Sequence, residues 1–344
     1  MKFLYDRWYA AAWPHEIADK PFNRKILDED ITFYRKSDGC PVAVSSRCPH
    51  RFAPMYYGAI NGDNIRCRYH GLEFGPNGAC VLNPDGSVAP NARLKAYPVV
   101  EQDSMIWIWM GAKAPDMAVP DILKIDPRMG GFVCGLVHVE AHYQLLLDNL
   151  LDQSHAPHLH SMLKSEALIE HSVPEVRQEG DTIYNTSWAP GRRPAPFWLA
   201  AGFEDIPIDQ KVDAKWEAPS SISVHAAIAP AGRPMEEGIS NVTIHLMTPG
   251  TENTTLYFWC HARDFRLEDH EYSDAVQGMF QKIFTDDDKW MIEGQARMMG
   301  DAEFWSLKPV LLPQDRATAL CRRHLDKLVA AQDGQGQTAR TTTI

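Results

Sequence analysis

Two short clusters of metal-binding side chains lie within the first 70 residues. One cluster contains Cys48 and His50, and the other contains Cys67 and His70, so each offers one thiolate and one imidazole. A Cys2His2 set can bind a structural zinc ion, but zinc sites usually pair two cysteines in one half and two histidines in the other. Because each half here holds one of each, the ligand order favours a [2Fe–2S] cluster with two thiolates on one iron and two imidazoles on the other.

A second group of candidate ligands lies in residues 148–160, which contain two aspartates and three histidines. Two histidines and one distant carboxylate would form the facial triad that holds non-haem Fe(II) and leaves positions open for O2 and substrate. His155 and His160 are the candidate histidines, and His158 is expected to be a lining or surface residue. The alternative is that these histidines are ordinary core or surface side chains beside an acidic helix.

The leucine spacing predicts a helix over residues 141–155, ended by Pro157. On that helix Asn149, Asp152 and His155 would share one face. Asn149 is then either a pocket residue near the metal or a simple helix-face amide.

The missing carboxylate is best sought among the three consecutive aspartates of residues 286–288, within a helix predicted over residues 279–299. One of the three should turn inward while the others face water. The acidic run could otherwise be a solvated helix N-terminus, where carboxylates are favourable.

The elements around the first two clusters are predicted to be short strands, so residues 1–115 would form a small all-β domain. β-branched and aromatic residues indicate strands over 31–35 and 42–44, and residues 105–109 indicate a buried strand. The ligand clusters lie between turn signals, as loops at hairpin tips would. Proline and small residues over 111–115 predict a linker.

The rest of the chain mixes helices and strands, so the fold class is α+β. The expected elements are helices over 141–155, 279–299 and 320–331, strands over 222–229, 242–247 and 255–262, an irregular stretch over 188–196, pocket walls at Phe197 and Trp198, and a polar tail over 333–344. The second domain would therefore cover residues 116–332.

Composition excludes several classes of protein. The 344 residues suggest two domains, and a net charge of -11 argues against a nucleic-acid partner. We expect no signal peptide and no membrane span, because no uncharged apolar run approaches about 20 residues. The seven cysteines are scattered apart from the two in the clusters, which predicts reduced thiols in a cytoplasmic protein. The chain has no nucleotide-binding glycine motif, so we expect no site for its own NAD or flavin.

Nearly the whole chain resembles the oxygenase components of Rieske non-haem iron monooxygenases. It is most similar to the branch of vanillate O-demethylase, dicamba O-demethylase and toluenesulfonate methyl-monooxygenase. The matching stretches are the Cys-Pro-His-Arg and Cys-Arg-Tyr-His-Gly loops at residues 48–51 and 67–71, the Asp-Asn-Leu-Leu-Asp segment at 148–152 with its following histidines, and Thr248-Pro249. The Asp-x4-Glu spacing of the family's iron-ligand helix falls on Asp288 and Glu293, and one extra acidic residue before Asp288 leaves Asp287 as a competing register.

The resemblance implies a residue-by-residue assignment and a helix-grip-like catalytic domain. Cys48 and Cys67 would bind one Rieske iron, and His50 and His70 the other. The mononuclear iron would be held by His155, His160 and Asp288. Asp152 matches the family's bridging carboxylate, which hydrogen-bonds a Rieske histidine of the neighbouring subunit and implies a homotrimer.

The resemblance also implies a function and partners. The leading hypothesis is O-demethylation of a methoxylated, vanillate-like aromatic acid in aromatic compound catabolism, with O2 consumption and release of formaldehyde. Electrons would come from an NAD(P)H-dependent reductase of the flavin and iron-sulfur type. The alternative within the class is hydroxylation of an aryl methyl or N-methyl group.

Two hypotheses come from other functional classes. One is a Rieske electron carrier without oxygenase activity, and the other is a binding protein stabilised by a structural zinc ion. A ferredoxin needs only about the first 115 residues, which argues against the carrier. For the substrate, His245 corresponds to a substrate-contacting histidine of dicamba O-demethylase, with a paired interior histidine as the alternative. The asparagine that helps to bind substrate there corresponds to Val224 in this chain.

Overall fold

The computed structural model describes residues 3–164 and 174–341, and the chain divides into two compact units. The N-terminal unit contains Tyr5–Leu123 together with Thr248–Glu252. The C-terminal unit contains Lys124–Met247 and the residues from Asn253 onward. The domain limits at residues 115 and 332 stay predictions.

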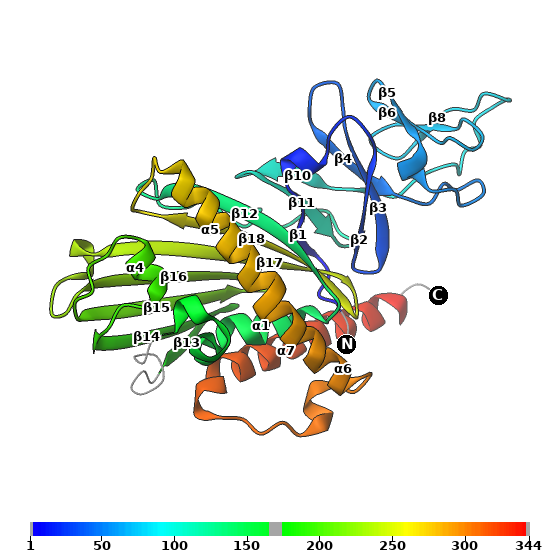
Figure 1. Cartoon of the computed structure of the whole chain (residues 1–344). Helices are drawn as coiled ribbons and strands as arrows, with labels where there is room; N and C mark the ends of the chain where they lie inside the picture. Colours follow the sequence, from blue (N-terminus) through cyan, green and yellow to red (C-terminus); the bar gives the residue numbers. More distant parts are fainter. Residues whose placement is uncertain (1–2, 165–173, 342–344) are drawn as a thin grey trace. The chain divides into compact units, whose positions relative to one another are not determined.

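Three small antiparallel sheets build the N-terminal unit, with the strand orders β1-β11-β10, β2-β3-β4-β9 and β5-β6-β7-β8 (Figure 1). The elements are β1 (Arg7–Ala12), η1 (Pro14–Glu16), β2 (Phe22–Ile26), β3 (Glu29–Arg35), β4 (Pro41–Ser45), η2 (Met55–Tyr57), β5 (Ala59–Asn61), β6 (Asn64–Arg66), β7 (Glu73–Phe74), β8 (Cys80–Leu82), β9 (Ala96–Tyr97), β10 (Val99–Gln102) and β11 (Met105–Met110). The predicted strands over 31–35, 42–44 and 105–109 are therefore present, and the all-β character is confirmed.

The apolar residues of these strands support the two cysteine loops. Strand β11 is buried along its whole length, because its apolar run Met-Ile-Trp-Ile-Trp-Met is the central strand of its sheet. A separate core contains Tyr34, Met55 and Phe74, and Cys48 and Cys67 are packed into it. The sulfur-bearing loops therefore begin from a rigid apolar base.

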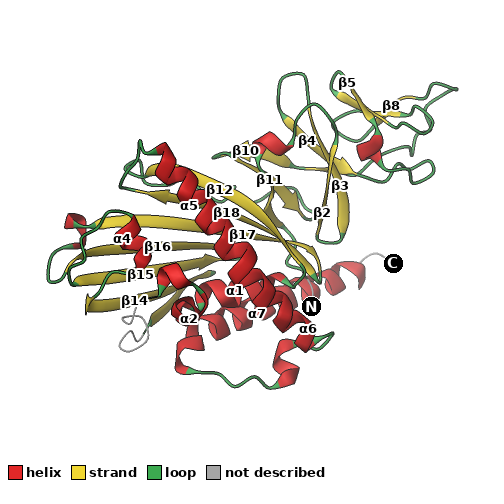
Figure 2. Ribbon diagram, viewed as in Figure 1, coloured by secondary structure: helices red, strands yellow, loops and turns green. Residues whose placement is uncertain are grey.

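The C-terminal unit is built on a seven-stranded sheet of order β12-β18-β17-β16-β15-β14-β13 (Figure 2). Its strands are β12 (Gly130–Val139), β13 (Glu175–Glu179), β14 (Thr182–Arg192), β15 (Ile208–Glu217), β16 (Ser221–Pro230), β17 (Ile239–Thr251) and β18 (Thr254–Arg263). Its helical segments are α1 (Tyr143–Leu151), η3 (Gln153–His155), α2 (Ala156–Leu159), η4 (Ser161–Leu163), α4 (Pro196–Ala200), η5 (Met235–Glu237), α5 (His270–Lys282), the π-helical η6 (Ile283–Asp288), α6 (Lys289–Met299), η7 (Phe304–Leu307), η8 (Pro313–Asp315) and α7 (Arg316–Thr341).

The long run α5–η6–α6 packs across the sheet through aromatic side chains (Figure 1). Phe280 and Phe284 lie 6.0 and 5.3 Å, ring centre to ring centre, from Trp259 of β18. Trp259 in turn lies over Gly135 of β12, where an added Cβ would meet the indole at 2.6 Å. Gly135 therefore permits the close packing that holds the long helical run against the sheet.

All three predicted helices have different limits in the structure, and the one expected over residues 320–331 is α7, which starts at Arg316. The helix expected over residues 141–155 ends at Leu151, because Asp152 is extended (φ -85°, ψ 96°) and its Oδ1 accepts the Ser154 N–H instead of continuing the helix. Pro157 does not end this helix, since it lies in the first turn of α2, where no N–H is needed.

The helix expected over residues 279–299 starts earlier, at His270, with Asp269 as its N-cap.

The stretch predicted to be irregular over 188–196 is irregular in residues 193–195 and belongs to β14 and α4 on either side. Strand β14 continues through Arg192, with a shift of register after Ala189 and with Gly191 at φ +65°, as in a β-bulge. The polar segment after residue 332 continues α7 as far as Thr341, since it contains no proline to end the helix.

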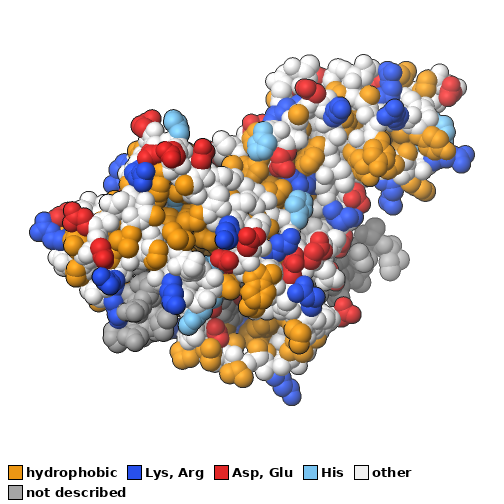
Figure 3. Space-filling view, viewed as in Figure 1, with side chains coloured by type: hydrophobic (Ala, Val, Ile, Leu, Met, Phe, Trp, Pro, Cys, Tyr) orange, Lys and Arg blue, Asp and Glu red, His pale blue; other side chains and the backbone are white. Residues whose placement is uncertain are grey.

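On the face shown in Figure 3, acidic and basic side chains are interspersed. Within the described ranges, we find no helix that combines the length and hydrophobicity needed to span a lipid bilayer.

A buried neutral histidine makes the C-terminal unit sensitive to acid. The Nδ1 atom of His142 accepts the N–H of Gln144 and caps α1. Burial, followed by the charge of Arg322, lowers the pKa of His142 to about 3. The folded state therefore keeps this ring neutral while the unfolded chain takes up a proton below about pH 6.5, so stability is present above that pH and is lost as the pH falls towards 3.

We expect His142→Asn to flatten the pH dependence of stability, because asparagine keeps the N-cap acceptor but does not titrate. Between pH 6 and 5 the slope of unfolding free energy against pH should fall by about 1 kcal/mol per pH unit relative to wild type. Denaturant unfolding followed by circular dichroism at several pH values measures this slope. His158→Asn, at an exposed histidine, is the control, and equal slopes for wild type and His142→Asn would contradict the prediction.

Candidate metal centres and substrate pocket

The two cysteine loops of the N-terminal unit share one backbone hydrogen-bond pattern. The N–H of Cys48 donates to the carbonyl of Ala53 (3.0 Å), and the N–H of Cys67 donates to the carbonyl of Leu72 (2.8 Å). In each loop the residue four positions after the cysteine donates back to the cysteine carbonyl, at 2.9 and 3.0 Å. Both cysteines are buried, so two equivalent loops present two sulfurs from the core.

At the bend of each cysteine loop, one residue adopts the left-handed backbone conformation. Gly71 adopts φ +72° at little cost because it has no Cβ. Phe52 adopts φ +60° at the equivalent position, although this region is unfavourable for a large side chain. Such strain persists only where the surrounding structure enforces it, and it often marks a functional site.

The two histidine rings lie together beside the sulfurs. The ring centres of His50 and His70 are 4.4 Å apart. The described residues contain one group of three or more Cys, His, Asp or Glu side chains whose ligand atoms all lie within 4.8 Å of one another. That group lies elsewhere in the chain. The four loop ligands do not form such a group, so the structure does not bring them to a single point as one zinc ion would require.

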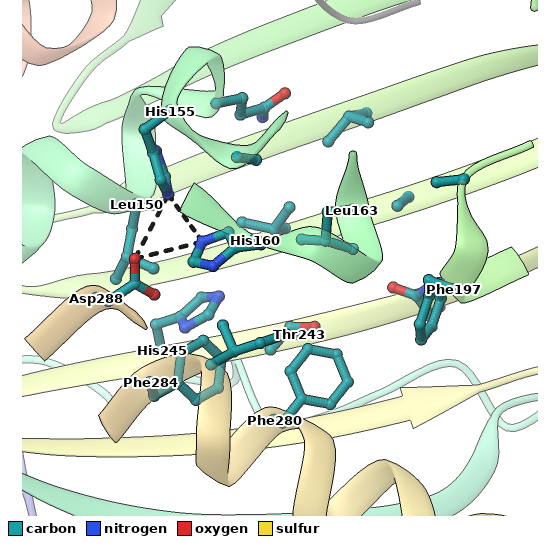
Figure 4. Close-up of a pocket in the computed structure, with 18 of the residues that line it drawn as sticks. Leu150, His155, His160, Leu163, Phe197, Thr243, His245, Phe280, Phe284 and Asp288 are labelled. Atoms are coloured by element: carbon teal, nitrogen blue, oxygen red, sulfur yellow. Dashed lines mark hydrogen bonds and ion pairs between the residues drawn. The ribbon is translucent and has the colours of Figure 1, made fainter. Parts of the chain in front are cut away.

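That convergent group consists of His155, His160 and Asp288 in the C-terminal unit (Figure 4). The two Nε2 atoms are 3.2 Å apart, and they lie 3.6 and 3.3 Å from Oδ1 of Asp288. These separations suit three ligand atoms that would bind one ion at about 2.1 Å. Two imidazoles and one carboxylate are the donor set of the facial triad that would hold non-haem iron.

The second nitrogen of each histidine is held by another group. Nδ1 of His155 contacts the backbone carbonyl of Asp152, and Nδ1 of His160 lies 3.3 Å from Oδ2 of Asp287. With Nδ1–H donating to these acceptors, both Nε2 atoms are free to bind a metal. Burial lowers the pKa of His155. Burial would also lower the pKa of His160, but the hydrogen bonds and charges of Asp288 and Asp287 outweigh it and raise that pKa.

The π-helical turn η6 selects which aspartate points inward. In this turn Phe284 and Asp288 are buried, while Asp286 is exposed. Single π turns of this kind are common at functional sites. Asn149 also donates to Oδ1 of Asp288 at 3.2 Å. The geometry therefore places Asp288 among the three convergent donors and gives Asp287 a supporting contact.

The triad lies at the wall of a largely apolar pocket with a cavity volume of about 170 Å³. A cavity of roughly this size holds one benzene-sized ring. The lining residues, apart from the triad, are Asn149, Leu150, Gln153, Ala156, Leu163, Ala195, Phe197, Trp198, Gln210, Val212, Val224, Ala226, Asn241, Thr243, His245, Phe280, Ile283 and Phe284. The predicted wall residues Phe197 and Trp198 are thus in place.

His245 lies at the end of the pocket that holds the triad (Figure 4). Its Nδ1 atom is 2.7 Å from the hydroxyl of Tyr257, and burial lowers its pKa to about 3. Burial also keeps the pKa of Tyr257 above its usual value. The phenol therefore donates to Nδ1, and the neutral ring of His245 keeps its proton on Nε2.

The structure also shows where the remaining predicted site residues lie. Asp152 is partly buried, and its Oδ1 accepts the Ser154 N–H at 2.9 Å. Because Asp152 separates α1 from η3, it does not share a continuous helix face with Asn149 and His155, as the sequence had suggested. His158 is exposed, in agreement with its expected place outside the triad.

Several polar residues of the site were missed in the sequence. They are Gln153, Gln210, Asn241, Thr243 and Tyr257. The signal in the sequence was the alternation of polar residues at positions 241, 243 and 245 along a predicted strand, which places them on one face.

Comparisons with known proteins agree with this arrangement. Residues 7–98 match the model of the Rieske [2Fe-2S] domain, and residues 139–331 match the C-terminal domain of the vanillate O-demethylase oxygenase. The oxygenase component of chloroacetanilide N-alkylformylase from Rhizorhabdus wittichii is 40% identical, over 96% of this chain and 97% of its own. The oxygenase component of dicamba O-demethylase from Stenotrophomonas maltophilia is 35% identical, over 95% and 98%.

A crystal structure of dicamba monooxygenase with non-haem iron and dicamba superimposes with a TM-score of 0.83 at 32% identity, covering 97% of this chain and 100% of the other. The protein is thus a Rieske-type non-haem iron monooxygenase component.

The chain belongs to the family of the vanillate O-demethylase oxygenases. It combines a Rieske [2Fe–2S] domain with a catalytic domain that has a mononuclear non-haem iron site. The donor sets fit these groups, since two thiols and two imidazoles suit the cluster and two imidazoles with one carboxylate suit the iron. As an oxygenase component, it takes electrons from a partner reductase and uses O2 with an aromatic substrate.

We expect Asp288→Ala to abolish mononuclear iron binding and to leave the visible spectrum of the Rieske cluster unchanged. Asp287→Ala should retain the iron but weaken its affinity by about 10–100-fold, because outer hydrogen-bond partners usually contribute that much. Metal analysis during titration with a chelator measures both effects. The exposed Asp286→Ala is the matched control and should behave as wild type. Full iron content in Asp288→Ala would refute the assignment.

Proposed function

We propose that this protein removes the methyl group from the oxygen of a methoxylated, vanillate-like aromatic acid. The observation that carries the proposal is the triad of His155, His160 and Asp288 at one end of an apolar pocket large enough for one ring. The reaction ArOCH3 + O2 + 2 e⁻ + 2 H⁺ → ArOH + HCHO + H2O is balanced. Hydroxylation of the methyl carbon gives a hemiacetal, which then releases formaldehyde and leaves the phenol.

We assign the metal ligands accordingly. Cys48, Cys67, His50 and His70 hold the cluster, and the triad holds the mononuclear iron. When bound, the cluster supplies electrons and the iron activates O2. Asp287 and the carbonyl of Asp152 keep the two imidazoles oriented, as outer hydrogen-bond partners do at other metal sites.

The pocket side chains orient the ring of the substrate. Phe280 and Phe284 form one wall, their rings 5.6 Å apart and nearly parallel. An aromatic substrate gains offset or edge contacts with such rings, and apolar surroundings exclude water from the reacting carbon. Nε2–H of His245, at the triad end, is a neutral donor for a substrate oxygen.

The proposal extends to partners. We propose a reductase of the flavin and iron-sulfur type, and a homotrimer in which Asp152 hydrogen-bonds a Rieske histidine of the neighbouring subunit. One carboxylate oxygen of Asp152 accepts the Ser154 N–H, which leaves the other available for that contact. We also propose a cytoplasmic location, on the argument from the scattered cysteines.

Oxidation of an N-alkyl group is the second candidate. It is favoured by the 40% identity to an oxygenase component named for N-alkylformylase activity. The same donors and pocket could oxidise a carbon bonded to nitrogen, because the carbinolamine collapses as the hemiacetal does.

The assay is formaldehyde release. With a reductase, NADH and O2, we expect one formaldehyde per O2 consumed from methoxylated benzoates, and little from the corresponding N-methyl compounds. Formaldehyde is measured colorimetrically and O2 with an electrode. The O-demethylase proposal fails if no methoxylated aromatic acid yields formaldehyde from protein loaded with both metal centres.

Asp152→Asn tests the electron path. Asparagine keeps the acceptor for the Ser154 N–H, so both metals should remain bound and the unfolding midpoint unchanged. Loss of the charge should slow oxidation of the reduced cluster in a single turnover by about 10-fold or more, since outer-shell changes of this kind usually cost 10–100-fold. Stopped-flow absorbance of the cluster measures this rate. Wild-type rates in Asp152→Asn would rule out the bridge.

A further inference from the structure

The floor of the pocket carries a polar stripe along β17. His245, Thr243 and Asn241 lie at alternate positions of this strand, and all three line the pocket. His245 is bonded to Tyr257, and Thr243 lies 3.1 Å from Nδ1 of His261. Among the described residues, the buried side chain of Asn241 has no such hydrogen bond.

A second amide lies across the floor. Gln210 of β15 is 7% exposed, and its Oε1 atom is buried without a hydrogen-bond partner in the described structure. Buried amides are nearly always bonded, so an unpaired one at a cavity wall points to a missing ligand. The amide can turn to offer either its oxygen or its NH2 group.

The strand between the two amides leaves room for a ligand. Ala226 of β16 pairs with Asn241 on one side and with Val212 on the other, and Gln210 follows at the next inward position of β15. Ala226 is small, so the amides face a common space above it.

The two amides lie away from the metal end. Asn241 is four residues along β17 from His245, which is about 13 Å at the rise of an extended strand. A benzene ring fits between these levels, so a group bound by Asn241 would be a ring substituent remote from the carbon that reacts.

The described lining residues include no countercharge for an anion at that end. None of them is lysine or arginine, and the acidic one is Asp288 of the triad. These residues can recognise a ligand there through neutral hydrogen bonds.

We propose that Asn241 and Gln210 form a subsite that binds the carbonyl oxygen of the ring substituent of the substrate, as a carboxylate or as an uncharged carboxamide. The inference rests on the proposed function, since it places the reacting carbon at the triad. These two side chains would determine which aromatic substrates bind.

The test compares three ligands that differ at one substituent: 3-methoxybenzoate, 3-methoxybenzamide and 3-methylanisole. Their dissociation constants are measured by calorimetry on the enzyme with both metal centres. For wild type we expect the better carbonyl ligand to bind at least 10-fold more tightly than 3-methylanisole. Whichever of the acid and the amide binds better identifies the substituent.

Asn241→Leu and Gln210→Met, both close in size to the native residues, should each reduce this preference to less than threefold. Gln178→Met, the same exchange at an exposed residue outside the pocket lining, is the control and should keep it. Asn241→Asp should weaken the benzoate at least 100-fold and the benzamide far less. Two independent variants protect the test against one that fails to fold, and iron content with the cluster spectrum verifies integrity.

A preference that survives both substitutions, or that is absent in wild type, overturns the subsite. Formaldehyde release separates this from failure of the proposed function. Demethylation with an unchanged preference in the variants would refute only the subsite. A preference lost in the variants without any demethylation by wild type would refute only the O-demethylase proposal.

Discussion

The structure of the catalytic unit depends on bringing three donor atoms, two of them on buried side chains, within 3.2–3.6 Å of one another from two segments that are far apart in the chain. Two backbone irregularities make this possible. The extended Asp152 redirects the chain after α1, so that His155 and His160 face the same point. The π turn η6 rotates Asp288 inward from an acidic run that would otherwise face water. A regular helix at either place would separate the donors.

Bringing these three polar side chains together would be unfavourable without further hydrogen bonds, since buried polar groups need hydrogen-bond partners. Each donor therefore has an anchor: the Asp152 carbonyl for His155, Asp287 for His160, and Asn149 for Asp288. The contacts also separate Asp287 from Asp288, which the sequence left as competing registers. The acidic residue that looked like a competing ligand is in contact with a histidine of the triad instead.

Local motifs were readable in the sequence, and long-range packing was not. The cysteine loops and the histidine pair are recognisable because each occupies a few consecutive residues, and the strands of the N-terminal unit follow from β-branched runs between turns. The break at Asp152 was missed because leucine periodicity predicts the helix without the competing Asx cap. The polar alternation at positions 241, 243 and 245 could have indicated Asn241, but the placement of Gln210 beside the same cavity could not be predicted, because it depends on the pairing of β15, β16 and β17.

The division between helical and sheet residues has a consequence for specificity. The metal donors and their anchors come from helical segments on the α1–α2 side and from η6, whereas the pocket floor comes from β15, β16 and β17. Side chains on a strand can be exchanged in pairs without moving the backbone of a helix, provided that volume and hydrogen bonding are kept. The floor can therefore change the substrate while the reacting centre stays the same. Related oxygenase components named for N-alkyl and for O-methyl substrates, on one fold, are what such an arrangement allows.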